Sequence, residues 1–143
     1  MVHVQREFTV NQPLEVVVDY LKDFGHAEQW DPGTVSCTRV GSGPIQVGAA
    51  WKNVSKVRGR ETQLDYRLER LEADHITFVG KNKTATSTDD ISFAAVGDGT
   101  RIRYDANIVF HGLAKLADPF MRRLFEGLGD ETVENMTSVL NER

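Results

Sequence analysis

NQPLEVVVDYLKDFGHAEQWDPG, residues 11–33, places two short helical patterns in succession near the start of the chain. Asn11 or Gln12 is a suitable helix cap, and a proline is well tolerated at the first helical position because its missing N–H has no partner to lose there. The pattern predicts a helix over about 13–23. A second short helix follows and ends at the DPG of residues 31–33, because proline disfavours helical geometry in the residue before it.

The segments on both sides of these helices are strand-like. Residues 2–10 alternate apolar and polar side chains, and Arg6 alone interrupts the apolar side. From about residue 34 to residue 111 the strand pattern is interrupted by the turn sequences GSGP, VRGR, EADH, GKNK and GDGT. Turns at such intervals are typical of antiparallel hairpins, so this region predicts a meander of about six strands.

Two strands of the meander show which side faces the core. In ETQLDYRLERL, residues 61–71, and TRIRYDANIVF, residues 100–110, apolar residues alternate with charged ones. This alternation is typical of an antiparallel sheet with one buried face. The residues predicted to face inward are Thr62, Leu64, Tyr66 and Leu68 in the first strand and Ile102, Tyr104, Ala106, Ile108 and Phe110 in the second.

The last segment changes to helical spacing. Asp118 and Pro119 resemble a cap followed by proline, so we expect a short turn from Leu113 and then a long helix to the C-terminus. Gly127 and Gly129 each weaken that helix by about 1 kcal/mol relative to alanine. They either let the helix pack closely on the sheet or leave space beneath it for a bound molecule. The apolar stripe of this helix contains Phe120, Leu124, Leu128, Met136 and Leu140.

Length and composition indicate one globular domain over residues 1–143. The net charge of −4 disfavours a dedicated nucleic-acid binder, which usually needs a clustered basic excess. The first residues lack the basic start and apolar run of a secretory signal, and no run approaches the length of a membrane span. We therefore expect a cytoplasmic protein without stable membrane insertion. Its single cysteine fits a reducing compartment.

The order of elements resembles the helix-grip fold of the START-like superfamily (SRPBCC, Bet v 1-like), which includes the polyketide cyclase/dehydrase and lipid-transport family. The similar stretches are VVVDYLKDFGHAEQWDP (16–32), GPIQVGAAW (43–51), GDGTRIRY (97–104) and HGLAKLADPFMRRLF (111–125). The resemblance implies an α+β fold in which a curved antiparallel sheet of about seven strands grips the long helix, with a mostly apolar cavity between them. It does not imply one chemistry, because members include carriers, sensors and cyclases.

Three candidate chemistries have little support. His26 and Glu28 would point in nearly opposite directions on a helix, so with Asp31 they make a poor metal site. Cys37 lies in no nucleophile motif, and its strand face is not assigned by the pattern. GSGPIQVG lacks the ending of a phosphate-binding loop and predicts a turn. Trp30 is better explained as an apolar plug beneath the helix pair, next to a cavity entrance.

WKNVSKVRGR, residues 51–60, indicates which side chains line the concave face. Lys52, Lys56 and Arg58 are expected to face solvent, where acidic residues of the next strand balance them; a basic patch for nucleic acid or a membrane surface is the weaker interpretation. The residues then expected to face the cavity are Trp51, Asn53, Ser55 and Val57. Apolar walls with a few polar groups are typical of small-molecule sites, although each tyrosine on this face is equally well explained as a core residue.

TATSTDDISF, residues 84–93, is unusually polar for a strand with one core face. Counting back from Phe93 places Ser87 and Asp89 inside and Asp90 outside. A buried Asp89 near a tyrosine would be an acid/base group for an aldol-type cyclisation or dehydration. The favoured alternative places Asp89 at a water-filled mouth or turns it outward through a bulge.

The favoured hypothesis is a binding protein for a hydrophobic small molecule, such as a lipid, polyketide or aromatic compound, held without a cofactor by a monomer or homodimer. The alternatives are a cyclase/dehydratase using Asp89 with a tyrosine, and a regulatory or toxin-like protein-interaction module. No catalytic residue is assigned under the favoured hypothesis. The predicted ligand-binding residues are Trp30, Trp51, Asn53, Tyr66, Phe78, Asp89, Tyr104, Phe110, Phe120 and Leu124.

Overall fold

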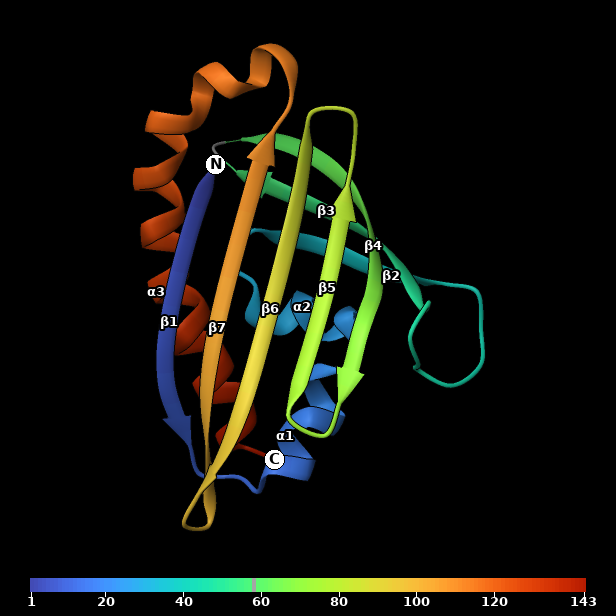
Figure 1. The fold of residues 1–143 in the computed structure, drawn as a ribbon, viewed down its shortest axis with the longest axis vertical. Coiled ribbons are helices and arrows are strands. Elements are labelled where there is room, and N and C mark those ends of the chain that lie inside the picture. Colours follow the sequence, from blue (N-terminus) through green and yellow to red (C-terminus); the bar gives the residue numbers. More distant parts are fainter. Residues whose placement is uncertain (58) are drawn as a thin grey trace.

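A curved antiparallel sheet with helices on one side forms the molecule (Figure 1). The computed structural model describes residues 1–57 and 59–143, without the side chains of Val57, Ala117 and Asp118. The predicted outward position of Arg58, the inward position of Val57 and the capping role of the Asp118 side chain therefore lie outside the described residues. The elements are β1 (Val2–Val10), α1 (Leu14–Leu21), the 3-10 helix η1 (Phe24–His26), α2 (Ala27–Trp30), β2 (Thr34–Val40), β3 (Ala50–Val57), β4 (Arg60–Glu72), β5 (His75–Lys81), β6 (Ala85–Val96), β7 (Gly99–Phe110), the 3-10 helix η2 (Gly112–Ala117) and α3 (Asp118–Asn141).

The sheet order is β1-β7-β6-β5-β4-β3-β2, with every neighbouring pair antiparallel. The predicted meander is thus confirmed, and β1 extends it by pairing with β7 at the edge of the sheet. In Figure 1, α3 runs behind the sheet along its β1 side, and α1 and α2 lie behind the lower half. The helix-grip arrangement is confirmed.

The first helix begins at a different cap from the one predicted. Pro13 itself is the N-cap of α1, and it makes no side-chain capping hydrogen bond. The prediction that Asn11 or Gln12 caps this helix is wrong, because Pro13 occupies the N-cap position. Both residues instead bond to the C-terminal end of the chain. The backbone N–H of Asn11 donates to Oδ1 of Asn141 at 2.9 Å, and Nε2 of Gln12 donates to the carbonyl of Arg143 at 2.9 Å.

The second short helix ends at the predicted DPG sequence. One Asp31 carboxylate oxygen accepts the Gly33 N–H at 3.1 Å, and the other accepts the Thr34 hydroxyl at 2.8 Å. These bonds fix the turn from α2 into β2. Asp31 therefore has a structural role that the proline-based argument did not assign to it.

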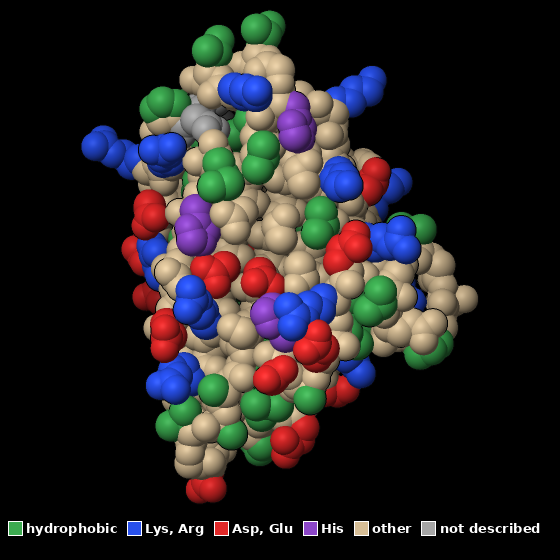
Figure 2. Space-filling model, in the orientation of Figure 1, with side chains coloured by type: hydrophobic (Ala, Val, Ile, Leu, Met, Phe, Trp, Pro, Cys, Tyr) green, Lys and Arg blue, Asp and Glu red, His purple; other side chains and the backbone are tan. Residues whose placement is uncertain are grey.

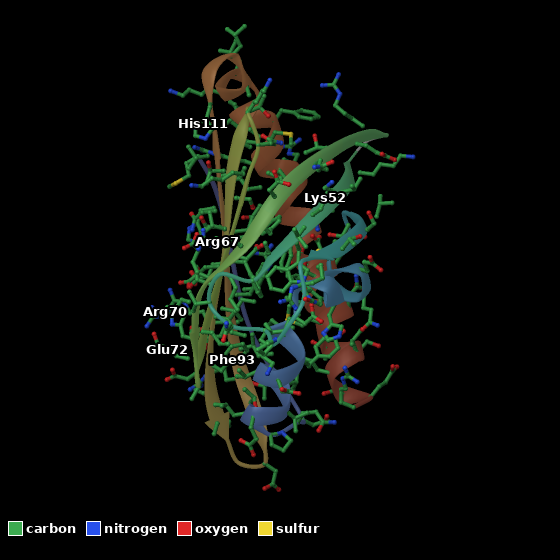
Figure 3. The ribbon with its side chains drawn as sticks, turned by 90° about the vertical axis from the view of Figure 1, so that its right-hand side faces the viewer. Lys52, Arg67, Arg70, Glu72, Phe93 and His111 are labelled. Atoms are coloured by element: carbon green, nitrogen blue, oxygen red, sulfur yellow. The ribbon has the colours of Figure 1, made fainter. Side chains whose placement is uncertain are left out.

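Most of the predicted inward pattern is present in the strands. Tyr66 and Leu68 of β4 are buried while their charged neighbours are exposed, and Lys52 and Lys56 of β3 are exposed. Thr62 is the exception, because it is exposed near the start of β4. Figure 3 shows the outward charged side chains of β4 on the convex side, away from the helices.

Arg6, the one charged residue on the apolar side of β1, is bound by α3. Its Nε donates to Asp130 at 2.9 Å, and its Nη2 donates to the carbonyl of Glu126 at 2.8 Å and to the carboxylate of Glu126 at 3.0 Å. Gly129 lies at the same contact: a Cβ there would stand 2.6 Å from Cγ1 of Val4. Close packing is therefore the explanation for Gly129.

Substituting Gly129 with alanine is expected to lower the free energy of unfolding by about 1–2 kcal/mol, because the contact with buried Val4 outweighs the gain in helix propensity. Gly127 supplies the matched control, since a Cβ there meets no atom within 4 Å. Gly127→Ala is expected to raise stability by up to about 1 kcal/mol. Urea denaturation of both variants measures the difference, and equal effects would contradict the close-packing explanation.

Candidate functional site

Four side chains on the concave face form the candidate site, the polar cluster (Tyr66, Ser87, Asp89 and Tyr104). Each keeps 5–7% of its surface exposed. Their apolar neighbours are closed off completely: Leu68, Ile76, Phe78, Ile91 and Ile102 are all 0% exposed. Each of the four polar side chains thus keeps a small exposed fraction beside apolar neighbours that have none.

Asp89 and Tyr104 form the centre of the cluster. The Tyr104 hydroxyl donates to Oδ1 of Asp89 at 2.7 Å, from β7 across to β6. The favoured expectation that Asp89 lies at a water-filled mouth or turns outward is wrong. β6 pairs with β5 and β7 without a register shift, so its side chains alternate regularly between the two faces. Asp89 therefore points inward and Asp90 outward.

Burial dominates the protonation of this pair. It raises the pKa of Asp89 to about 7; the hydrogen bond from Tyr104 acts in the opposite direction, and the negative charge of Asp31 raises it further. Burial and the nearby Asp89 charge also hold the pKa of Tyr104 well above its usual range. Asp89 can therefore exchange a proton near neutral pH, whereas Tyr104 remains a neutral hydrogen-bond donor.

Tyr66 joins the cluster because β5 has a glycine opposite it. Gly80 is its cross-strand partner, and a Cβ on Gly80 would stand 2.5–2.7 Å from atoms of the Tyr66 ring. The ring thus lies across β5, and the Tyr66 hydroxyl reaches the Ser87 side chain on β6. Sequence reasoning missed Gly80. The available signal was an isolated glycine within a strand, which often marks such a close approach.

Four of the predicted ligand-binding residues lie at the closed part of the concave face. Trp30 and Trp51 are 1% exposed, Asn53 is 1% exposed and Phe78 is 0% exposed. The Trp51 indole N–H donates to Asp23 at 3.0 Å. The Asn53 amide donates to the Thr34 hydroxyl at 3.0 Å and accepts from Ser55 at 2.7 Å. Contact between these four residues and a ligand stays a prediction.

Trp30 packs against two aromatic rings of the core. Its ring meets the rings of Phe24 and Tyr104 edge to face, each at 6.0 Å between centroids. Its indole N–H is buried and makes no hydrogen bond within the described part of the chain. Trp30 thus packs directly behind Tyr104 and supports the polar cluster.

Burial decreases toward the η2 end of the concave face. Leu64, Ile108 and Phe110 are half-buried on the sheet, and Leu124 and Leu128 are half-buried on α3. Phe120, farther along the predicted stripe, is 52% exposed. An apolar surface that is not fully covered therefore begins beyond the polar cluster.

The remaining polar candidates have structural partners. Glu28 accepts the backbone N–H of Cys37 at 2.7 Å, and His26 bonds the carbonyl of Tyr20 at 2.6 Å. Burial raises the pKa of the Cys37 thiol to about 12, which disfavours the thiolate that a nucleophile needs. Among the described residues, no group of three or more His, Cys, Asp and Glu side chains is placed to hold a metal ion.

A surface groove of about 690 Å³ runs along the β1 edge of the sheet, separate from the polar cluster. Its lining consists of Met1, Val2, His3, Pro119, Arg122, Arg123 and Glu126. Within the described ranges, no helix has both the length and the apolar character needed to cross a membrane.

Solved structures share this fold at low sequence identity. A START superfamily protein from Mycobacterium smegmatis matches with a TM-score of 0.80 and 13% identity, covering 98% of this chain and 97% of that one. The aromatase/cyclase ZhuI from Streptomyces sp. R1128 matches with a TM-score of 0.75 and 14% identity, covering 98% and 91%. A STAR-related lipid transfer protein fragment from Xanthomonas axonopodis gives 0.74 and 12% identity, covering 96% and 85%.

Sequence comparison gives the family. No curated protein matches the chain. A family model described as polyketide cyclase / dehydrase and lipid transport matches residues 1–141, nearly the whole chain. The chain therefore belongs to the polyketide cyclase/dehydrase and lipid-transport family.

Proposed function

We propose that this protein binds a hydrophobic small molecule, such as a lipid, polyketide or aromatic compound, between the concave face and α3. The observation that supports this most is the polar cluster, whose four members each keep 5–7% of their surface exposed beside fully buried apolar residues. The half-buried apolar residues beyond the polar cluster would form the walls of the binding site, and Phe120 would lie at its rim. Burial of apolar ligand surface would contribute about 25 cal/mol per Å².

The polar cluster would orient the ligand. A protonated Asp89 carboxyl has a hydrogen to donate to a ligand carbonyl, and its ionised form accepts from a ligand hydroxyl. Tyr66 and Ser87 add hydroxyl groups that can rearrange around either partner. We infer that the protein acts as a single domain over residues 1–143 and that this binding needs no cofactor.

Titration with the neutral apolar dye N-phenyl-1-naphthylamine tests the proposal. Leu124→Trp and Leu128→Trp, made separately, are expected to weaken dye binding at least about tenfold, because the larger ring would fill space the dye needs. Val47→Trp is the matched control, since Val47 is 57% exposed on the loop before β3. Native mass spectrometry of the protein from its own cells would identify a retained ligand. Unchanged dye affinity in both leucine variants would overturn the proposal.

The Asp89–Tyr104 pair supports a second candidate, a cyclase or dehydratase. In such a reaction the Asp89 carboxylate would remove a proton from the carbon next to a substrate carbonyl, and that carbon would form the new bond to a second carbonyl carbon. The resulting alkoxide would take a proton back, and dehydration would release water. Asp89→Asn should abolish turnover of a synthetic poly-β-ketone thioester if this holds. Under the binding proposal, the same variant keeps dye affinity nearly unchanged.

A further inference from the structure

Large apolar side chains are exposed at one end of the molecule, where β7 leads into α3. Leu113 is 86% exposed and Leu116 is 81% exposed, both on η2, and Phe120 is 52% exposed on the first turn of α3. We call Leu113, Lys115, Leu116 and Phe120 the η2 tip. Such a concentration of exposed apolar surface on a short projecting segment is unusual for a surface that meets only water.

Basic side chains surround the tip. Lys115 belongs to it, and Arg122 and Arg123 are exposed on the next turn of α3. Lys81 ends β5 and Lys83 lies in the turn that follows. This turn lies beside the tip, since the backbone N–H of His111 donates to the carbonyl of Thr84 at 2.8 Å. Figure 2 shows hydrophobic and basic side chains together at this end, while the described acidic side chains in view lie lower.

The groove along the β1 edge continues this surface. Arg122 and Arg123 line it together with the apolar residues Val2 and Pro119. The acidic residue in its lining, Glu126, is already paired with Arg6 at 3.0 Å. Among the described residues, apolar side chains and the basic side chains of Arg122 and Arg123 therefore lie together at this end of the molecule.

This combination fits the surface of an anionic phospholipid bilayer. Exposed leucines gain free energy by entering the boundary between head groups and acyl chains, and lysine and arginine are attracted to anionic head groups. A symmetric contact between two copies would bring like charges together at the same place. Nucleic acid would satisfy the cations but leave the leucines without apolar contact.

We propose that the η2 tip docks reversibly on an anionic phospholipid bilayer. The docking adds a membrane-surface interaction to the proposed ligand binding and does not depend on it. It also differs from membrane insertion, because only side chains of η2 and the start of α3 enter the head-group region.

Vesicle co-sedimentation of the full chain tests the docking. We expect binding to phosphatidylcholine vesicles containing about 30% phosphatidylserine, and much weaker binding to pure phosphatidylcholine. Leu113→Ser combined with Leu116→Ser is expected to reduce partitioning at least about tenfold. Lys115→Glu should reduce it more than about fivefold, because it removes one cation and adds an anion.

The control replaces exposed apolar residues elsewhere. Val40→Ser combined with Val47→Ser changes residues that are 56% and 57% exposed, and it should leave partitioning unchanged. All variants should keep the wild-type melting temperature and dye affinity without vesicles, which separates this test from that of ligand binding. Equal partitioning of the leucine variant and wild type would overturn the proposal, as would equal binding to neutral and anionic vesicles. Concentration-dependent self-association without vesicle binding would also overturn it, and would assign the tip to a dimer.

Discussion

Phe24→Ala is expected to lower the free energy of unfolding by about 3–5 kcal/mol. Phe24 is 1% exposed, and its ring lies 4.3 Å from Tyr66 and 4.6 Å from Phe78 between centroids. It also meets Trp30 at 6.0 Å and Trp51 at 6.2 Å, edge to face. A cavity at this position would remove contacts with four aromatic rings at once, and the surrounding sheet can collapse only partly to fill it.

Urea denaturation followed by circular dichroism measures this loss. Phe120→Ala is the matched control, because the same atoms are removed from a side chain that is 52% exposed. Its expected effect is within about 0.5 kcal/mol. A loss below about 1 kcal/mol for Phe24→Ala would show that the aromatic cluster is not the centre of the core.

The second large effect is a fall in stability with rising pH that depends on Asp89. The pKa of Asp89 is about 7 in the folded protein and about 3.9 in an unfolded chain. Between these two values the folded state holds a proton that the unfolded state has released, so the free energy of unfolding decreases as pH rises through this window. The full decrease in the free energy of unfolding is about 4 kcal/mol. Above the folded-state pKa, this group causes no further change with pH.

Asp89→Asn removes this titration while keeping an oxygen that accepts from Tyr104. Denaturation at pH values from about 4 to about 8 should show the variant gaining stability over wild type as pH rises, by about 4 kcal/mol at the upper end. Asp65→Asn is the control, since Asp65 is exposed on the outer face of β4. It should retain the wild-type pH dependence. A wild-type profile that parallels Asp89→Asn would mean that Asp89 is not buried as a neutral acid.

Much of the fold could be predicted because its signals are local. Alternation in residues 61–71 and 100–110 gave the buried face of two strands, and the DPG sequence gave the end of α2. The cap of α1 could not be predicted in this way. The Gln12 side chain bonds to the far end of the chain, and a capping preference measured over a few residues does not include such long-range contacts.

The candidate site was also predictable only in part from local sequence. Alternation alone places Asp89 on the inner face, and the tertiary structure decides that it is buried and paired with Tyr104. Gly80 is visible in the sequence as a glycine within a strand, but the Tyr66 ring that occupies its space comes from the neighbouring strand. Phe24 lies between the two short helices without a periodic pattern to mark it, so its central position in the core was missed.

The amino-acid sequence was sufficient to predict the order of elements and the buried face of most strands, because periodicity and turn chemistry act between residues that are near in the chain. The tertiary structure was needed to show which polar groups contact one another on the concave face, how tightly the aromatic core packs, and that exposed leucines and basic residues lie together at the η2 end. These properties depend on distances between side chains far apart in sequence, and those distances are set when the sheet curves around the helices.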